Sequence, residues 1–373
     1  MDDLDRLINK GIAKNARQTR LLTFFTGVAI FIESNLSVLT AGILSRGLFD
    51  KFRLSRAELA YIVDSTSAPI CILILLNGWG AYVLGLLGAY PLTENPVSIL
   101  MQTIPLNFYP IFTLLLVLFT ILTGRHFGPM KQANLQQQQR INNQNTPNDV
   151  EVAGGKSRYM LIPLLTMMVS MVGFMYWTGN GDLSAGSGSK SVLYATTLAC
   201  LVAYALLAFD RKFNHQQLVE IGYKGMSELL GLVTILLLAM ALGASLKTLG
   251  TGSYIAGLVA QSMPLFLIPA MMFLAGALIS FTTGTSWGTF ALLIPIGMPL
   301  VLDLNLPPAL ILAAILGGGV FGDHCSPISD TTAVSAVAAG CDLLEHVKTQ
   351  LPYALFCAAL SFMAYLLMGW WMI

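Results

Sequence analysis

Two long stretches of the chain contain no lysine and no arginine. The first runs from Ala57 to Gly124 over 68 residues, and the second from Thr248 to Val347 over 100 residues. The hydrocarbon core of a bilayer excludes such charges, whereas a water-exposed surface uses them throughout. Over the whole chain 55% of residues are apolar and 10% are charged, compared with about 25% charged residues in soluble domains. This composition excludes a soluble enzyme, a disordered chain and a nucleic-acid-binding domain, and it predicts an all-α, polytopic membrane protein.

The basic residues gather in four clusters, within residues 6–20, 46–56, 125–158 and 211–224. The positive-inside rule places all four on the cytoplasmic side, so we expect a multi-pass protein of the inner membrane. The charged first 20 residues contain no apolar core of a cleavable signal peptide. The five cysteines have no metal-binding or redox spacing and are interpreted as small apolar residues.

Five stretches are apolar over the length of about 20 residues that a spanning helix needs. They are residues 107–123, 159–178, 191–209, 229–247 and 352–372. Residues 124–158 are polar, with eleven Gln or Asn between 132 and 148, and predict a flexible cytoplasmic linker. This linker separates an N-terminal membrane half, 1–123, from a C-terminal membrane half, 159–373.

Three further apolar regions are interrupted by polar residues, Gly and Pro. Residues 21–45 are too short for two crossings, yet both flanks are basic, which predicts a re-entrant hairpin with its tip near Glu33-Ser34-Asn35. Residues 57–90 contain a break from Asp64 to Pro69. Residues 264–340 contain the breaks TSWGT and SPISDTT. Unwound backbone at membrane depth survives where protein or a water-filled cavity satisfies it.

The two halves repeat this arrangement. Asn35 precedes Asp64 by 29 residues, and Ser286 precedes Asp323 by 37 residues. Each unit therefore contains a hairpin-like break followed by a break that begins with Asp and contains Pro. We predict two pseudo-repeats with re-entrant hairpins and broken helices, and broken helices at matching positions are typical of a transporter's binding site.

Four carboxylates fall within the apolar regions without a neighbouring Lys or Arg. A buried carboxylate without a partner either binds a proton or holds a cation, and burial disfavours its charged form. Proton and cation then compete for the same oxygens, which supports exchange of Na⁺ for H⁺, and hard cations prefer oxygen ligands. The predicted site comprises Glu33, Asn35, Asp64, Ser65, Thr66, Thr285, Ser286, Asp323, Ser326, Asp330 and Thr331, with Asp64 and Asp323 as the Na⁺ ligands.

Other roles compete with these assignments. Asp64 and Asp323 are also suited to capping a helix at a break, and Glu33 and Asp330 to a position nearer the membrane interface. The hydroxyl residues, Ser329 among them, are equally suited to bonds between helices. His324 is either a proton relay or a structural hydrogen-bonding residue. Trp79 and Trp287 either pack or contact a substrate.

Four segments carry a resemblance to a known family: FIESNLSVLTAG from Phe31, SRAELAYIVDSTSAPIC from Ser55, SFTTGTSWGTFALLIPI from Ser280, and the stretch from Gly317 to Leu355 that contains FGDHCSPISDTT. They resemble the NhaC-type Na⁺/H⁺ antiporter family of a wider ion-transporter superfamily. The resemblance implies electrochemically driven Na⁺/H⁺ exchange. It also implies a cation site at Asp64, Thr285, Ser286, Asp323, Ser326, Asp330 and Thr331. Related members exchange small carboxylates such as malate and lactate.

The chain departs from this family in two respects. Many relatives carry paired Asp where this chain has Glu33-Ser34. Family members are also usually longer, so we expect several N-terminal spans to be missing here.

The leading hypothesis is a secondary antiporter that exchanges Na⁺ for H⁺ by alternating access. A second hypothesis is Na⁺- or H⁺-coupled transport of a small carboxylate or amino acid, and a third is an intramembrane aspartyl protease with Asp64 and Asp323 as its dyad. The leading hypothesis predicts no enzymatic activity and no cofactor beyond the transported Na⁺ and H⁺. The sequence leaves open whether the chain forms a homodimer.

Overall fold

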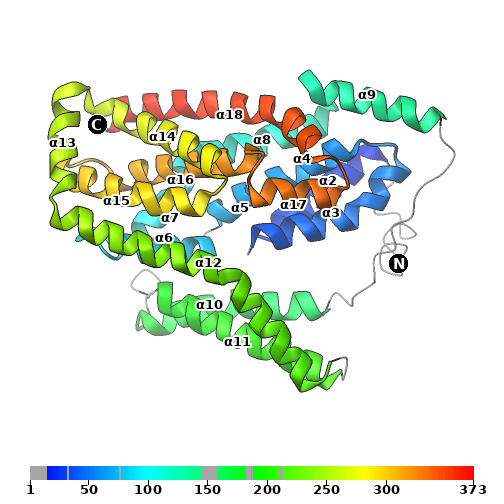
Figure 1. Cartoon of the computed structure of the whole chain (residues 1–373), viewed down its shortest axis with the longest axis horizontal. Helices are drawn as coiled ribbons and strands as arrows, with labels where there is room; N and C mark the ends of the chain where they lie inside the picture. Colours follow the sequence, from blue (N-terminus) through cyan, green and yellow to red (C-terminus); the bar gives the residue numbers. More distant parts are fainter. Residues whose placement is uncertain are drawn as a thin grey trace.

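The computed structural model describes residues 15–31, 33–74, 77–143, 158–181, 186, 188–210 and 213–373, and these residues form helices without any strand (Figure 1). The helices of the N-terminal half and the linker are α2 (Ala16–Ala29), α3 (Ser34–Lys51), α4 (Arg56–Ser65), α5 (Ala68–Leu73), α6 (Gly78–Leu87), α7 (Pro96–Gln102), η1 (Ile104–Leu106), α8 (Phe108–Thr123) and α9 (Gly128–Asn143). Those of the C-terminal half are α10 (Arg158–Thr178), α11 (Gly188–Phe209), α12 (His215–Thr248), α13 (Thr251–Ser262), η2 (Leu265–Leu267), α14 (Ile268–Thr283), α15 (Ser286–Leu304), α16 (Pro308–Cys325), α17 (Asp330–Ala339) and α18 (Leu343–Met372).

Within the described residues, five helical segments are long and apolar enough to cross a membrane. They are Phe108–Gln137, Leu265–Thr283, Ser286–Leu304, Pro308–Cys325 and Leu343–Met372. The bent pair Arg56–Leu73 and Gly78–Leu87 makes a sixth if it forms one span. The chain is therefore a multi-pass membrane protein.

All five predicted single spans are helical, but two of the helices begin much earlier than the apolar runs. The run 229–247 lies inside α12, which begins at His215, and the run 352–372 lies inside α18, which begins at Leu343. Asp342 caps α18 by accepting a hydrogen bond from the Glu345 backbone N–H at 3.0 Å. This extension brings a polar first section of α18 into the protein interior.

Each half contains a helical hairpin. In the first, α2 and α3 are joined at Ile30–Glu33, and the Glu33 carboxylate caps α3 by accepting bonds from the backbone N–H groups of Asn35 and Leu36. In the second, α14 ends at Gly284, whose φ of +70° favours glycine, and Thr285 caps α15. The hairpin predicted with its tip near Glu33-Ser34-Asn35 is present.

Each half also contains the predicted broken helix. The first consists of α4 and α5, interrupted at Thr66-Ser67, and the second of α16 and α17, interrupted at residues 326–329. The two broken helices lie against each other, because α17 packs on α3 and α4 while α5 packs on α16. Each broken helix therefore packs against helices of the other half of the chain.

Two helix pairs approach closely through glycine. A methyl group at Gly318 or Gly322 of α16 would overlap backbone atoms of α14. A Cβ atom at Gly42 of α3 would lie 2.7 Å from the Cβ atom of Ala338 in α17. Small residues allow such backbone contact between membrane helices.

The linker prediction requires a correction. We expected a flexible connector over 124–158, but Gly128–Asn143 forms α9, which packs against α4 and α18. Met130 and Ala133 supply a small buried apolar face three residues apart, enough to seat a helix whose other residues are mostly polar. Residues 144–157, the rest of the Gln- and Asn-rich segment, lie outside the described residues.

Helices α10 and α11 lie side by side at the periphery, and α12 runs from beside them toward α13 (Figure 1). Many large apolar side chains on these helices are exposed, including Val169, Leu201 and Leu237. Such an apolar exterior is expected where lipid, and not water, surrounds the helices.

Candidate ion-binding site

Asp323 lies in the last turn of α16 and is 2% exposed. Its carboxylate accepts hydrogen bonds from Ser286 Oγ at 2.7 Å and Ser329 Oγ at 2.6 Å, with Thr331 Oγ1 at 3.4 Å. Ser286 begins α15, Ser329 precedes α17 and Thr331 lies in its first turn, so the break in α16–α17 and the tip of the second hairpin converge on one carboxylate. The predicted residues Asp323, Ser286 and Thr331 thus form one cluster.

Asp64 lies in the last helical turns of α4 and is fully buried. Its Oδ2 atom lies 3.1 Å from His346 Nε2 and accepts a hydrogen bond of 2.8 Å from Gln350 Nε2. Its Oδ1 atom is buried and has no hydrogen-bond partner among the described residues. Both partners come from the early section of α18, and neither is among the predicted site residues.

His324 connects the surroundings of Asp64 with those of Asp323. Its ring nitrogens lie 2.9 Å from Ser65 Oγ and 2.7 Å from Tyr109 Oη. Its backbone oxygen accepts a hydrogen bond from Gln350 Nε2, the same nitrogen that donates to Asp64. A continuous buried network therefore runs from Asp64 on α4 to the residue that follows Asp323 on α16.

Glu33 and Asp330 lie in more open surroundings. Both residues are exposed, and Glu33 caps α3 as described above. Asp330 Oδ2 is 3.4 Å from Asn35 Nδ2, and its Oδ1 accepts from the Thr331 backbone N–H. The tip of the first hairpin thus reaches the second broken helix, 295 residues later in the chain.

Three predicted ligands use their hydroxyls elsewhere. Thr66 bonds to carbonyls of its own helix, α4. Thr285 caps α15, and Ser326 donates to the Phe281 carbonyl at 2.7 Å, which fixes the break against the end of α14. In this conformation these residues shape the breaks and do not contact a carboxylate.

The two tryptophans lie together. The centroids of the Trp79 and Trp287 rings are 5.2 Å apart, and the Tyr82 hydroxyl donates a hydrogen bond of 3.1 Å to the Trp287 carbonyl. Trp79 is only 2% exposed, whereas Trp287, next to Ser286, is partly exposed. Packing accounts for Trp79, and Trp287 borders the Asp323 cluster.

The side chains of the Asp323 cluster offer oxygen atoms as ligands. The cluster consists of one carboxylate and three hydroxyls. Among the described residues, no ion pair with Lys or Arg involves Asp323. Among the described contacts, neither the Asp323 nor the Asp64 carboxylate accepts a hydrogen bond from a backbone N–H at a helix N-terminus. These contacts therefore do not support a helix-capping role for either residue. A protease dyad needs two carboxyl groups sharing a proton, yet these two carboxylates have separate partners.

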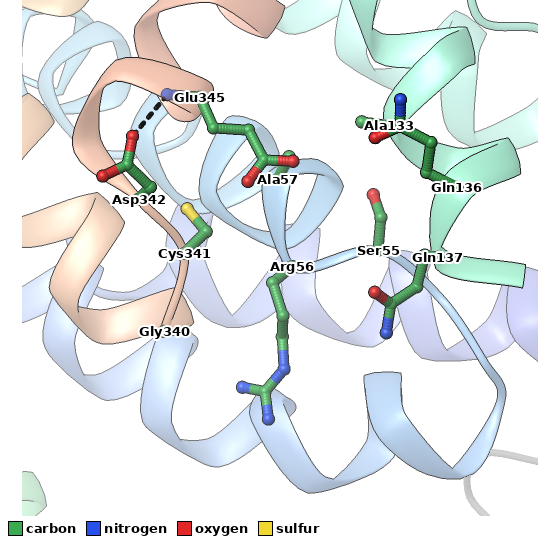
Figure 2. A pocket seen from close by; sticks show the side chains of 10 residues that line it. All are labelled: Ser55, Arg56, Ala57, Ala133, Gln136, Gln137, Gly340, Cys341, Asp342 and Glu345. Carbon is green, nitrogen blue, oxygen red and sulfur yellow. Dashed lines mark hydrogen bonds between the residues drawn. The ribbon is translucent and has the colours of Figure 1, made fainter. Parts of the chain in front are cut away.

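A polar cavity of about 320 Å³ opens where α4, α9 and the turn between α17 and α18 meet (Figure 2). Figure 2 shows Asp342 and Glu345 on one side of it, Gln136 and Gln137 on the other, and Arg56 between them. Glu345 precedes His346, and Ala57 lies on the same helix as Asp64. The cavity therefore lies at the ends of the two helices that carry the Asp64 network.

Comparison with known proteins decides the family. The sequence profile of the Na⁺/H⁺ antiporter family matches residues 70–370. The chain belongs to this family. The match includes TSWGT, SPISDTT and the α18 residues that contact Asp64, while Asp64 itself lies just before the matched residues. The resemblance seen in the sequence motifs is confirmed.

Individual relatives and one solved structure are similar to this chain. A Haemophilus influenzae protein described only as uncharacterized is 32% identical over 95% of this chain and 72% of its own length. A second H. influenzae protein, described as an uncharacterized Na⁺/H⁺ antiporter, is 39% identical over 28% of this chain and 22% of its own length. The solved structure of the Neisseria gonorrhoeae efflux pump MtrF superposes with a TM-score of 0.58 at 14% identity, covering 94% of this chain and 74% of that one. The last comparison confirms a transporter fold.

Proposed function

We propose that this antiporter-family chain exchanges Na⁺ for H⁺ across the inner membrane by alternating access. Asp323 and Asp64 are the groups that bind the ions, with the hydroxyls of Ser286, Ser329 and Thr331 as neutral ligands to the cation. On the more open side of this ion-binding site lie Asp330, Asn35 and Glu33.

The observation that carries this proposal is the Asp323 cluster. A buried carboxylate beside three hydroxyls, with no cationic side chain paired to it in the described part of the chain, is costly unless it binds a proton or a cation. Carboxylate and hydroxyl oxygens suit a hard cation such as Na⁺. Because Na⁺ and H⁺ use the same carboxylate oxygens, binding of one displaces the other.

The orientation follows from the arginines. Arg46 and Arg56 donate to the carbonyls of Val337, Ala338 and Ala339 at the C-terminus of α17. Positively charged segments remain in the cytoplasm, so this end of α17, the neighbouring cavity and α9 are cytoplasmic. The Asp323 cluster lies one ten-residue helix further into the protein.

Purified chain in proteoliposomes with an imposed pH gradient tests the proposal. A pH-sensitive dye should report collapse of the gradient on addition of Na⁺, with K⁺ and Li⁺ as ion controls. Asp323→Asn should abolish the response, whereas Asp303→Asn, at an exposed position on α15, should retain it. A response in wild type that persists in Asp323→Asn would contradict the assigned site.

A second candidate function is coupled transport of a small carboxylate or amino acid. It is favoured by the partly exposed Trp287, which follows Ser286 in the Asp323 cluster and packs against Trp79 with its ring tilted. An aromatic wall beside a cation site suits an organic substrate better than a bare ion. A Na⁺-dependent thermal shift on adding a dicarboxylate, absent with Na⁺ alone, would support this candidate over simple Na⁺/H⁺ exchange.

A further inference from the structure

Helix α18 directs two side chains at Asp64. His346 and Gln350 are four residues apart, which places them on one face of the helix, and both are fully buried. Both contact the same atom, Asp64 Oδ2, at 3.1 Å and 2.8 Å. Helix α18 belongs to neither broken helix, so a third element holds this carboxylate in place.

The Gln350 amide nitrogen has a second acceptor on the other broken helix. It donates to Asp64 on α4 and to the backbone oxygen of His324 on α16. A primary amide nitrogen has two hydrogens, and both are used here. The amide oxygen of Gln350 is buried and has no partner among the described residues.

We propose that Gln350 is a positioning residue that couples the occupancy of Asp64 to that of the Asp323 cluster. This role rests on the Na⁺/H⁺ exchange proposed above. When Asp64 binds a proton or a cation, its Oδ2 atom becomes a poorer acceptor, so the amide shifts. A shift leaves the buried His324 carbonyl without its donor, which is unfavourable, and changes the end of α16 that carries Asp323. Binding linkage makes the effect reciprocal between the two acids.

The titratable groups around this amide come from four helices. They are Asp64 on α4, Tyr109 on α8, Asp323 and His324 on α16, and His346 on α18. Gln350 is the neutral member that bonds to α4 and α16 at once. Its effect on coupling therefore arises from hydrogen bonding and not from a charge of its own.

The test separates coupling from a merely structural role by measuring two fluxes on the full chain in proteoliposomes. One is ²²Na⁺/Na⁺ exchange at equal pH, which needs the cation site alone. The other is the number of protons moved per Na⁺ under a Na⁺ gradient. Gln350→Met keeps the length of the side chain and removes both donors, and Gln216→Met at an exposed position on α12 is the matched control.

We expect Gln350→Met to lower the protons moved per Na⁺ at least about fivefold, with ²²Na⁺/Na⁺ exchange within about twofold of wild type. The Gln216→Met control should change neither flux.

Equal loss of both fluxes in Gln350→Met, or an unchanged coupling ratio, would overturn the positioning role. If this variant aggregates on gel filtration, Gln350→Leu takes its place with the same expectations, and failure of both to fold would show a structural role instead. Wild-type chain that exchanges ²²Na⁺ but moves no protons contradicts the proposed Na⁺/H⁺ function itself, and the coupling role with it.

Discussion

Ser286 donates a 2.7 Å hydrogen bond to Asp323, which lies 37 residues later in the chain. The donor begins α15 at the tip of the second hairpin, and the acceptor lies in the last turn of α16, before the break of the second broken helix. One bond therefore joins the two irregular backbone segments of the C-terminal repeat and points a hydroxyl at the proposed cation ligand.

Replacing Ser286 with alanine should weaken Na⁺ binding without unfolding the chain. The substitution removes one neutral ligand and leaves one Asp323 oxygen without its donor, which costs about 1–2 kcal/mol. The KM for Na⁺ in proteoliposome exchange should rise about tenfold. Ser227→Ala on the exposed part of α12 is the matched control. An unchanged KM in Ser286→Ala would remove Ser286 from the cation site.

The contact between α14 and α16 should not tolerate a methyl group. Gly322→Ala would place Cβ against backbone atoms of Phe281 and Ser280, so it should lower the free energy of unfolding by about 1–3 kcal/mol. Thermal melting in detergent measures the loss. Gly85→Ala on α6, where no atom lies within 4 Å of the new Cβ, should melt at the wild-type temperature or slightly above. Equal melting of both variants would show that the two helices separate more easily than their packing indicates.

Arg46 should hold α17 in place. Its guanidinium donates to the Val337 and Ala338 carbonyls at 2.6 Å and 2.7 Å, at the negative end of the helix dipole. Arg46→Ala should lower the free energy of unfolding by about 2 kcal/mol, seen as a lower melting temperature in detergent. Arg125→Ala, at an exposed position after α8, is the comparison that should leave melting unchanged.

Cys341 should react slowly with alkylating reagents although it lines the cavity in Figure 2. Burial, with the nearby Glu345 and Asp342 carboxylates, raises the pKa of the Cys341 thiol to about 12. Only the thiolate reacts, so the iodoacetamide rate should still be rising at pH 10. In a Cys341→Ser background, Gln136→Cys at an exposed position on the same cavity should level off near pH 8.5, the ordinary thiol pKa. A Cys341 rate that levels off at the same pH would contradict its burial. Intact-mass spectrometry follows both reactions.

The sequence allowed prediction of the features that break a regular pattern. Clusters of Gly, Pro and hydroxyl residues marked the ends of α14 and α16 and the start of α15, because a run that combines these residue types interrupts the apolar pattern of a membrane helix. Acidic residues inside apolar runs marked Asp64 and Asp323. Both signals are local, so they can be recognised without knowing the fold.

The residues that hold Asp64 gave no such signal. His346 and Gln350 stand in a polar stretch before Pro352, outside the span predicted over 352–372. Only their spacing of four residues indicates one helix face, and their partner lies 282 to 286 residues earlier in the chain. The same applies to α9, where two apolar residues in a Gln-rich helix are enough for packing once α4 and α18 supply the opposing surface.

The close contacts at glycine define two packed helix pairs in the membrane domain. Gly318 and Gly322 fasten α16 to α14, while Gly42 and the Arg46 bonds fasten α17 to α3. Residues 326–329 connect α16 of one pair to α17 of the other, and Ser329 bonds to Asp323. Any movement of one pair against the other would therefore act directly on the short segment whose Ser329 hydroxyl bonds to Asp323.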